Sequence, residues 1–158
     1  MRNSRVTVSK PQLNLDTFLP YRLSVLSNRV SDAIARQYSE RFNLSIPEWR
    51  IIAVLGQSPD LSARDVAART AMDKVQVSRA VTSLVSAKRV ARTEDATDAR
   101  ITRLTLTARG RAIYEEVAPL ALHLESLLLS SLSAQERTTL RDLMHKLDRQ
   151  VSLLSARE

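Results

Sequence analysis

The sequence of 158 residues contains no cysteine, two glycines, two histidines and 4% aromatic residues. Without cysteine the chain has no disulfide, no thiolate metal site and no thiol that could sense oxidation. We find no glycine-rich phosphate loop, no nucleophile elbow and no metal-binding motif. No apolar run approaches the roughly 18 residues that span a bilayer. We therefore expect a cytoplasmic protein that is not an enzyme, has no cofactor or metal and does not enter a membrane.

Positive charge is concentrated in one part of the chain. The full sequence has a formal net charge of +7, and the segment from Ser62 to Arg111, with eleven basic and five acidic residues, carries +6 of it. The length and the 44% apolar content are sufficient for one domain with a real core. A basic face predicts an anionic partner. The alternative is a charged surface that only meets water.

Hydrophobic periodicity predicts two helices in the first third of the chain. Apolar residues three or four positions apart from Leu15 to Phe42 indicate one long amphipathic helix. Ser45 and Glu48 have the spacing of a capping box, so a second helix is expected to run through EWRIIAVL and to stop at Gly56.

Two shorter helices follow, joined by the residues TAMD. Ser62 with Asp65 is expected to open the first of them, ARDVAART, and Asp73 with Gln76 to open the second, KVQVSRAVTSLVSAK. In the second helix the spacing places apolar residues on one face and polar residues on the other. Two helices joined in this way predict a helix-turn-helix, whose second helix enters the major groove of DNA.

The periodicity then changes to the alternation of β-strands. RVART and ITRLTL are predicted strands, and EDATDAR between them is a predicted exposed hairpin loop. Two long helices with apolar stripes complete the chain. Thr107 is expected to cap the first, and Ser133 with Glu136 forms a capping box for the second.

The predicted fold is mainly α: a winged helix-turn-helix domain with a two-stranded β-wing, flanked by long N- and C-terminal dimerisation helices. Its predicted parts are a loose tail over residues 1–14, a helical dimerisation region over 15–44 and 108–158, and the DNA-binding domain over 45–107. A DNA-binding core of this size cannot cover both long apolar stripes, so we expect a homodimer. The alternative is that these helices pack only within one subunit.

Six outward residues of the second helix of the helix-turn-helix are candidates for DNA contact: Lys74, Val75, Gln76, Ser78, Arg79 and Thr82. The cations can reach phosphate or guanine, the amide can pair with adenine, the Ser78 hydroxyl can donate to phosphate, and the valine can contact the thymine methyl group. The alternative is a surface helix whose polar face is solvated.

The hairpin loop adds Arg100, whose guanidinium is of the kind that enters the narrow, electronegative minor groove. Asp98, two residues earlier, can hold this arginine through a charge-assisted hydrogen bond and fix its direction. The alternative for this pair is an ordinary loop salt bridge, which contributes under about 1 kcal/mol when exposed.

The stretch SARDVAARTAMDKVQVSRAVTSLVSAKRVARTEDATDARITRLTLTARGRA closely resembles the central region of MarR-type winged-helix regulators, including their VSR, D-x-R and L-T-x-x-G signatures. The resemblance extends more loosely over about residues 15 to 155. It implies a homodimer that binds a pseudopalindromic DNA operator, usually represses transcription and is released by a small molecule. One departure is Arg89 in AKRV, which we align with a position where glycine is usual.

The resemblance also implies an effector site near the dimer axis, between the first, second and fifth helices. Arg22, Tyr38, Trp49 and His123 are the candidates, for an effector such as an aromatic acid or its thioester. Core packing is the simpler role for Tyr38 and Trp49, and solvent exposure is the simpler role for Arg22. His123 and His145 lie on different predicted helices, so we reject a zinc site. Two other functions stay open: an architectural DNA-binding protein without a ligand, and a winged-helix module that binds protein.

Overall fold

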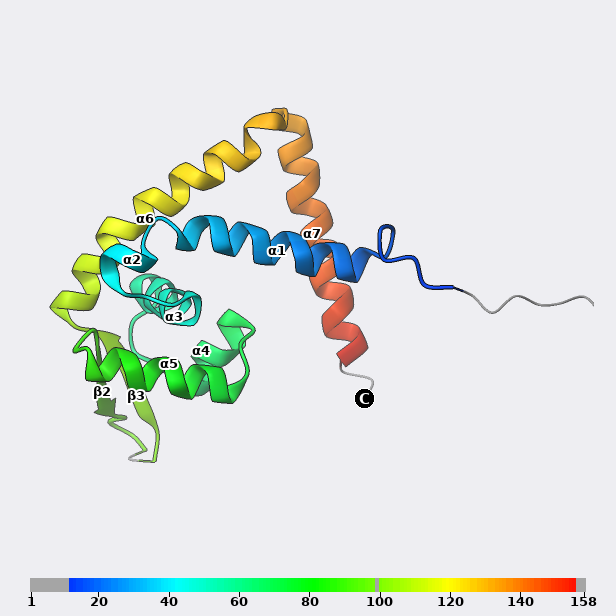
Figure 1. The fold of residues 1–158 in the computed structure, drawn as a ribbon. Coiled ribbons are helices and arrows are strands. Elements are labelled where there is room, and N and C mark those ends of the chain that lie inside the picture. Colours follow the sequence, from blue (N-terminus) through cyan, green and yellow to red (C-terminus); the bar gives the residue numbers. More distant parts are fainter. Residues whose placement is uncertain (1–11, 99, 156–158) are drawn as a thin grey trace, which may run out of the picture. The chain divides into compact units, whose positions relative to one another are not determined.

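The computed structural model describes residues 12–98 and 100–155, which are mainly helical (Figure 1). The elements follow the predicted order of helices, hairpin and two long helices. They are α1 (Leu19–Ala35), α2 (Ser39–Phe42), α3 (Ile46–Gln57), β1 (Leu61–Ser62), α4 (Ala63–Thr70), α5 (Lys74–Ser86), β2 (Val90–Glu94), β3 (Thr102–Leu106), α6 (Ala108–Leu128), the 3₁₀ turn η1 (Leu129–Ser131) and α7 (Ala134–Ser155). The chain divides into two compact units, of which one ends at Ile46 and the other begins at Pro47.

In the first unit, the prediction of a single helix from Leu15 to Phe42 is wrong, because the structure has two separate helices there. The α1 helix begins only at Leu19. Pro20 has no backbone N–H to donate, and in a helix interior its ring would clash with the carbonyl of the preceding turn, so it is accommodated in the first turn. After Ala35 the backbone tightens into a turn, with the Tyr38 N–H donating to the Ala35 carbonyl at 3.0 Å. The turn separates α1 from α2 and leaves Tyr38 buried.

Four helices of the second unit begin at the predicted caps. The Asp65 N–H donates to Ser62 Oγ at 3.2 Å and the Ser62 N–H donates to Asp65 Oδ2 at 3.0 Å, which is a complete capping box. Asp73 accepts from the Gln76 N–H at 2.8 Å. The remaining caps are Thr107 for α6 and the Ser133–Glu136 pair for α7. Their success shows how local these signals are, since each pair lies within one helical turn.

The sheet has one strand more than the predicted hairpin. Its order is β1-β3-β2, with both pairs antiparallel. The hairpin of β2 and β3 is the predicted wing, and its loop projects past α5 (Figure 1). The short strand β1 pairs Leu61 with Leu104 and Ser62 with Arg103. Two residues are too few to show the alternation of a strand, so β1 was not predictable from the sequence.

The end of α5 corrects the alignment of Arg89 with the usual glycine. Lys88, one residue earlier, has a φ of 56° in the left-handed region that favours glycine. The Lys88 N–H donates to the Val85 carbonyl and the Arg89 N–H to the Leu84 carbonyl, both at 2.9 Å. These bonds form the Schellman motif that ends many helices, with lysine at the position where glycine is preferred.

A close backbone contact explains the L-T-x-x-G sequence at the start of α6. The Thr107 hydroxyl donates to the Lys88 carbonyl at 2.8 Å and accepts from the Gly110 N–H at 3.1 Å. A Cβ atom added at Gly110 would lie 2.0 Å from the Arg89 carbonyl oxygen. Glycine is therefore the residue that lets α6 approach the end of α5 this closely.

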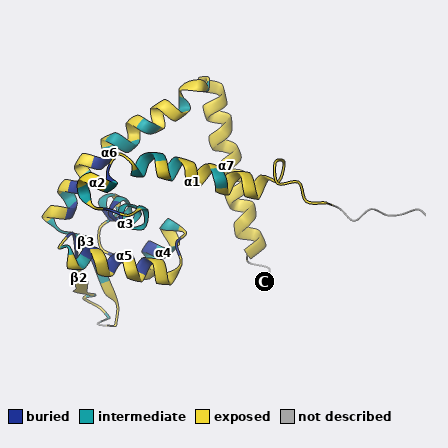
Figure 2. Cartoon of the chain, in the orientation of Figure 1, coloured by how far each residue is buried: buried dark blue, intermediate teal, exposed yellow. Residues whose placement is uncertain are grey.

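The core of the second unit is built from α3, α4, α5, the sheet and the first half of α6 (Figure 2). Its most deeply buried side chains include Ile51, Ile52, Leu55, Val66, Val77, Leu84, Val90, Leu104 and Val117. In contrast, α7 is exposed along its whole length (Figure 2). Among the described residues no single helix is long and apolar enough to cross a membrane; only α6 with η1 and α7, bent by 110°, match as a pair by length and composition.

Candidate nucleic-acid interface

The turn between α4 and α5 is short and fully specified by its residues. Ala71 ends α4 with a φ of 53°, in the left-handed region. Met72 is buried, and Asp73 is extended and caps α5. This succession changes the direction of the chain within three residues, and α5 packs against α4. The predicted helix-turn-helix is therefore present.

The α5 helix has one buried and one exposed face. Val77, Ala80, Val81 and Leu84 are buried, as the helical period predicts. All six residues predicted to contact DNA are exposed: Lys74, Val75, Gln76, Ser78, Arg79 and Thr82. Val75 is 59% exposed although it is a large apolar residue. The face therefore offers cations, an amide, hydroxyls and methyl groups together, which is the set that reads base edges and phosphates.

A buried carboxylate connects α5 to α3, a contact between distant residues that no local sequence pattern predicts. Glu48 is buried, and its Oε1 atom accepts a hydrogen bond of 2.5 Å from the Ser83 hydroxyl. The two residues are 35 positions apart. A charge-assisted hydrogen bond to a buried carboxylate restrains the rotation of α5 about its axis, and so restrains the direction of its exposed face.

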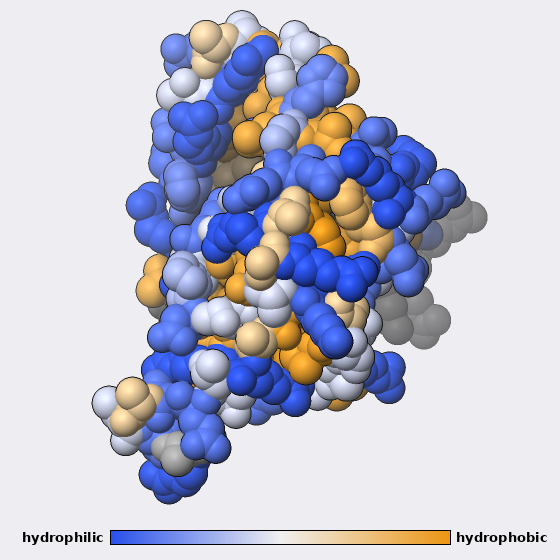
Figure 3. Space-filling model, turned by 90° about the vertical axis from the view of Figure 1, so that its left-hand side faces the viewer, coloured by the Kyte–Doolittle hydropathy of each residue, from blue (hydrophilic) through white to orange (hydrophobic). Residues whose placement is uncertain are grey.

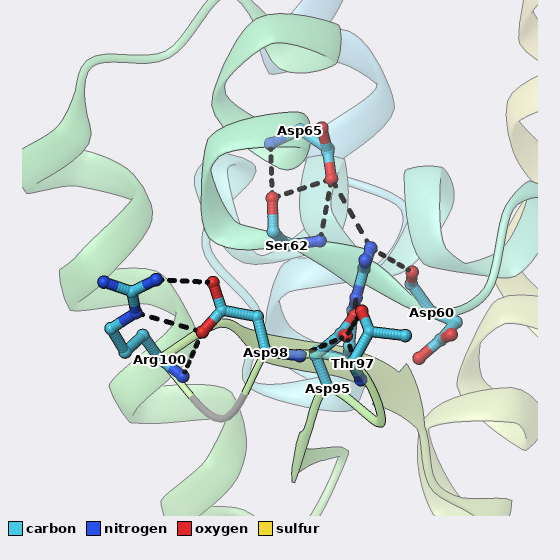
Figure 4. Close-up of polar contacts among 8 residues, drawn as sticks. Asp60, Ser62, Asp65, Asp95, Thr97, Asp98 and Arg100 are labelled. Atoms are coloured by element: carbon cyan, nitrogen blue, oxygen red, sulfur yellow. Dashed lines mark hydrogen bonds and ion pairs between the residues drawn. The ribbon is translucent and has the colours of Figure 1, made fainter.

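The wing loop presents Arg100 as predicted. The Asp98 carboxylate accepts from the Arg100 backbone N–H at 3.0 Å, from Nε at 3.1 Å and from Nη2 at 3.3 Å (Figure 4). These bonds from Arg100 lower the pKa of Asp98 below its ordinary value. The Arg100 side chain is nevertheless 90% exposed. The guanidinium is held from one side and available from the other.

Two further wing residues, Asp95 and Arg103, were not identified from the sequence. Asp95 accepts from the Thr97 N–H at 2.8 Å, from the Thr97 hydroxyl at 2.5 Å and from the Asp98 N–H at 3.1 Å (Figure 4). It also accepts from Arg103 Nε at 2.5 Å. The bonds from Thr97, followed by those from Arg103 and Asp98, strongly lower the pKa of Asp95. The projecting wing tip is covered mainly by hydrophilic side chains (Figure 3, lower left).

A groove of about 420 Å³ lies between α4, α5 and the sheet. Val77, Val81 and Leu104 contribute apolar lining, and the cations around it include Lys74, Arg64 and Arg92. No acidic side chain within residues 12–98 and 100–155 forms an ion pair with any of these three cations. Arg64 and Arg92 thus line the same groove as Lys74 and Ser78 of α5, and their positive charge is available beside the exposed face of that helix.

The four candidate effector residues have different environments. Arg22 on α1 and His123 on α6 are exposed, whereas Tyr38 is buried. Trp49 is half-buried, and its ring stacks on Tyr114 with centroids 6.4 Å apart. Within the described part of the chain, no three His, Cys, Asp or Glu side chains are grouped so that they could hold a metal ion.

Comparisons with known proteins agree with this geometry. A model of the MarR family matches residues 42–101. A helix-turn-helix (HTH)-type transcriptional repressor of Mycobacterium tuberculosis is 28% identical over 131 residues, which cover 82% of this chain and 91% of the relative. The HTH-type transcriptional regulator BilQ of Clostridium symbiosum is 30% identical over 108 residues, which cover 68% of this chain and 75% of BilQ. The crystal structure of a MarR/EmrR family transcriptional regulator from Acinetobacter sp. ADP1 is 28% identical, with a TM-score of 0.82 over 89% of this chain and 99% of that one.

Proposed function

This chain belongs to the MarR family of transcriptional regulators, and on that premise we propose that it represses transcription from a pseudopalindromic operator, which it binds as a homodimer. The observation that supports this most directly is that the exposed face of α5 and the exposed Arg100 guanidinium belong to one basic domain. Residues 45–107 are the proposed DNA-binding domain. The regulator class accounts for a site that has DNA-recognition groups and no catalytic motif.

The two DNA-contacting elements have different proposed roles. Gln76 and Arg79 of α5 read base edges in the major groove, Val75 contacts a thymine methyl group, and Lys74 contacts phosphate. The hydroxyls of Ser78 and Thr82 donate to phosphate oxygens of the DNA backbone. Arg100 enters the minor groove, where the acceptor pattern barely distinguishes A·T from T·A, while Asp98 fixes its direction.

The homodimer is proposed from exposed apolar side chains. On α7 the apolar seam is exposed, with Leu140 at 41% and Val151 at 61%. The same seam contains Leu143, Met144, Leu147 and Leu154, and Leu19, Leu23 and Leu26 are exposed on α1. Apolar surface of this extent is normally covered by a partner. We assign residues 15–44 and 108–158 to the dimer interface, with a second copy of the chain as the partner.

Release from DNA is proposed to depend on a small organic effector, because the chain has no cysteine to sense oxidation. An aromatic acid or its thioester is the class that the family resemblance suggests. Arg22, Tyr38, Trp49 and His123 are the proposed contacts. A thermal-shift screen against such acids tests this part, since a ligand that binds the folded state raises its melting temperature.

The DNA-binding proposal is tested by selecting duplexes from a random-sequence library with the full chain. We expect a pseudopalindrome whose half-sites lie about one helical turn apart, because a two-fold dimer reads the same sequence twice. Selection without any sequence preference would support an architectural protein instead. Failure to retain any duplex at low salt would leave the protein-binding module as the better function.

A further inference from the structure

Arg103 lies at the centre of a hydrogen-bonded network that joins the wing to the helix-turn-helix. Its Nε atom donates to Asp95 Oδ2 at 2.5 Å, and its Nη1 atom donates to the Asp60 carbonyl at 3.3 Å. The same Nη1 atom lies 4.0 Å from Asp65 Oδ2. One guanidinium therefore connects the loop after β2, the residue before β1 and the capping box of α4.

The network continues from Asp95 to the wing tip. Through its other oxygen, Oδ1, Asp95 accepts from the backbone N–H groups of Thr97 and Asp98. Asp98 in turn holds Arg100 (Figure 4). A continuous series of hydrogen bonds and ion pairs, of which the longest is the 4.0 Å contact with Asp65, thus runs from the start of α4, through Arg103 and Asp95, to the exposed arginine.

The link between Arg103 and Asp95 is better shielded from water than the pair at the tip. The Asp95 side chain is 9% exposed and that of Arg103 is 30% exposed, against 90% for Arg100. A shielded ion pair loses less to solvent screening and holds its geometry better than an exposed one. A two-stranded ribbon that is held near its loop in this way requires less ordering when its tip binds.

We propose that Arg103 and Asp95 are positioning residues that fix the wing relative to α4 and α5 and thereby direct Arg100 toward the minor groove. This inference rests on the proposed DNA-binding function, and it assigns the two residues an indirect role. The competing role is direct contact: Arg103 would itself neutralise a phosphate, and Asp95 would only repel the DNA.

The two roles predict opposite changes in DNA affinity when the charge of Asp95 is removed. Asp95→Asn removes a negative charge, so simple electrostatics predicts tighter DNA binding. The variant retains an amide oxygen for the Thr97 and Asp98 N–H groups, but loses the carboxylate that holds Arg103. Positioning therefore predicts weaker binding.

Glu94→Gln is the matched control, because it removes one negative charge from the neighbouring residue. Glu94 is exposed and has no ion pair among the described residues. Binding is measured with the duplex selected from the random library, at one fixed ionic strength. We expect Asp95→Asn to weaken binding by about threefold or more, which corresponds to the interaction energy that residues in contact commonly show. We expect Glu94→Gln to leave the affinity unchanged or to increase it. Equal effects of the two variants would overturn the proposal.

A double-mutant cycle with Arg103→Leu and Arg100→Ala provides the second test. If Arg103 acts through Arg100, its substitution has much less effect once Arg100 is absent. If Arg103 contacts phosphate itself, the two losses add, and the positioning role is rejected. Thermal melting shows whether Arg103→Leu and the double variant fold. If either does not fold, the comparison of Asp95→Asn with Glu94→Gln decides whether the positioning role holds.

Failure of the proposed DNA-binding function and failure of the positioning role give different results. If the wild-type protein binds no duplex, the proposed function fails and the inference fails with it. If the wild type binds and Arg100→Ala weakens binding, while Asp95→Asn matches Glu94→Gln, only the positioning role is wrong.

Discussion

At the scale of single residues, Arg100 and Gln76 are expected to fail in different ways. Arg100→Ala should cost about 1 to 3 kcal/mol of binding free energy on operator and variant sites alike, and should reduce the salt slope by about one cation per subunit. Gln76→Ala should chiefly reduce discrimination between sites, because an amide reads adenine in the major groove. Fluorescence anisotropy with the selected and the scrambled duplex measures both. An Arg100→Ala variant that folds and keeps both affinity and slope would show that the wing does not touch DNA.

Lys88 allows a test of the backbone rather than of the interface. Its φ of 56° is costly for a residue with a Cβ atom, so Lys88→Gly should raise the free energy of unfolding by about 1 kcal/mol. Lys88→Ala removes the same charge but keeps the Cβ atom, and should give no such gain. Urea denaturation of both variants compares them. Equal stabilities for glycine and alanine would argue against strain at this position.

At the scale of elements, the wing should keep its internal bonds throughout the neutral pH range. The bonds from Thr97 to Asp95, and those from Arg100 to Asp98, lower both pKa values below the ordinary 3.8. A carboxylate with a depressed pKa in the folded state stabilises the fold above its unfolded pKa, and this stabilisation is lost as the pH falls through the folded pKa. DNA affinity should therefore show no wing-dependent change from about pH 5 to 8. A loss of affinity near pH 6 that disappears in Arg100→Ala would contradict this.

The elements also show which features a sequence can specify. The caps at Ser62, Asp73 and Thr107 were predictable because each contact is made within three residues of the chain. The outward face of α5 followed from the helical period in the same way. Arg100 and its partner Asp98 are separated by only two residues, and their pairing was also predicted.

What the sequence did not reveal depends on contacts between distant residues. Arg103 meets the Asp60 carbonyl across 43 positions, and Ser83 meets Glu48 across 35. No local pattern records such pairs. The break between α1 and α2 was missed because the apolar spacing continues through the turn at Tyr38. Lys88 was missed because a lysine carries no signal for a left-handed backbone.

At the scale of the whole molecule, assembly should depend on α7. Leu147→Glu and Val151→Glu together place two charges on the exposed apolar seam, and should convert the proposed dimer to a monomer without unfolding the second unit, because α7 is exposed there. Ser152→Glu adds a charge to the same exposed helix on the face away from the seam, and serves as the control. Sedimentation at micromolar concentration measures the result. A double variant that remains dimeric would exclude the α7 seam from the interface.

If this chain reads DNA through a basic winged helix, its affinity must depend both on the sequence of the duplex and on the salt concentration. The measurement compares the selected duplex with a scrambled duplex of equal length at three salt concentrations. We expect tighter binding to the selected duplex, with the logarithm of affinity falling linearly with the logarithm of salt concentration by about 0.9 per phosphate neutralised. Equal affinity for both duplexes, or an affinity that does not change with salt, would contradict it.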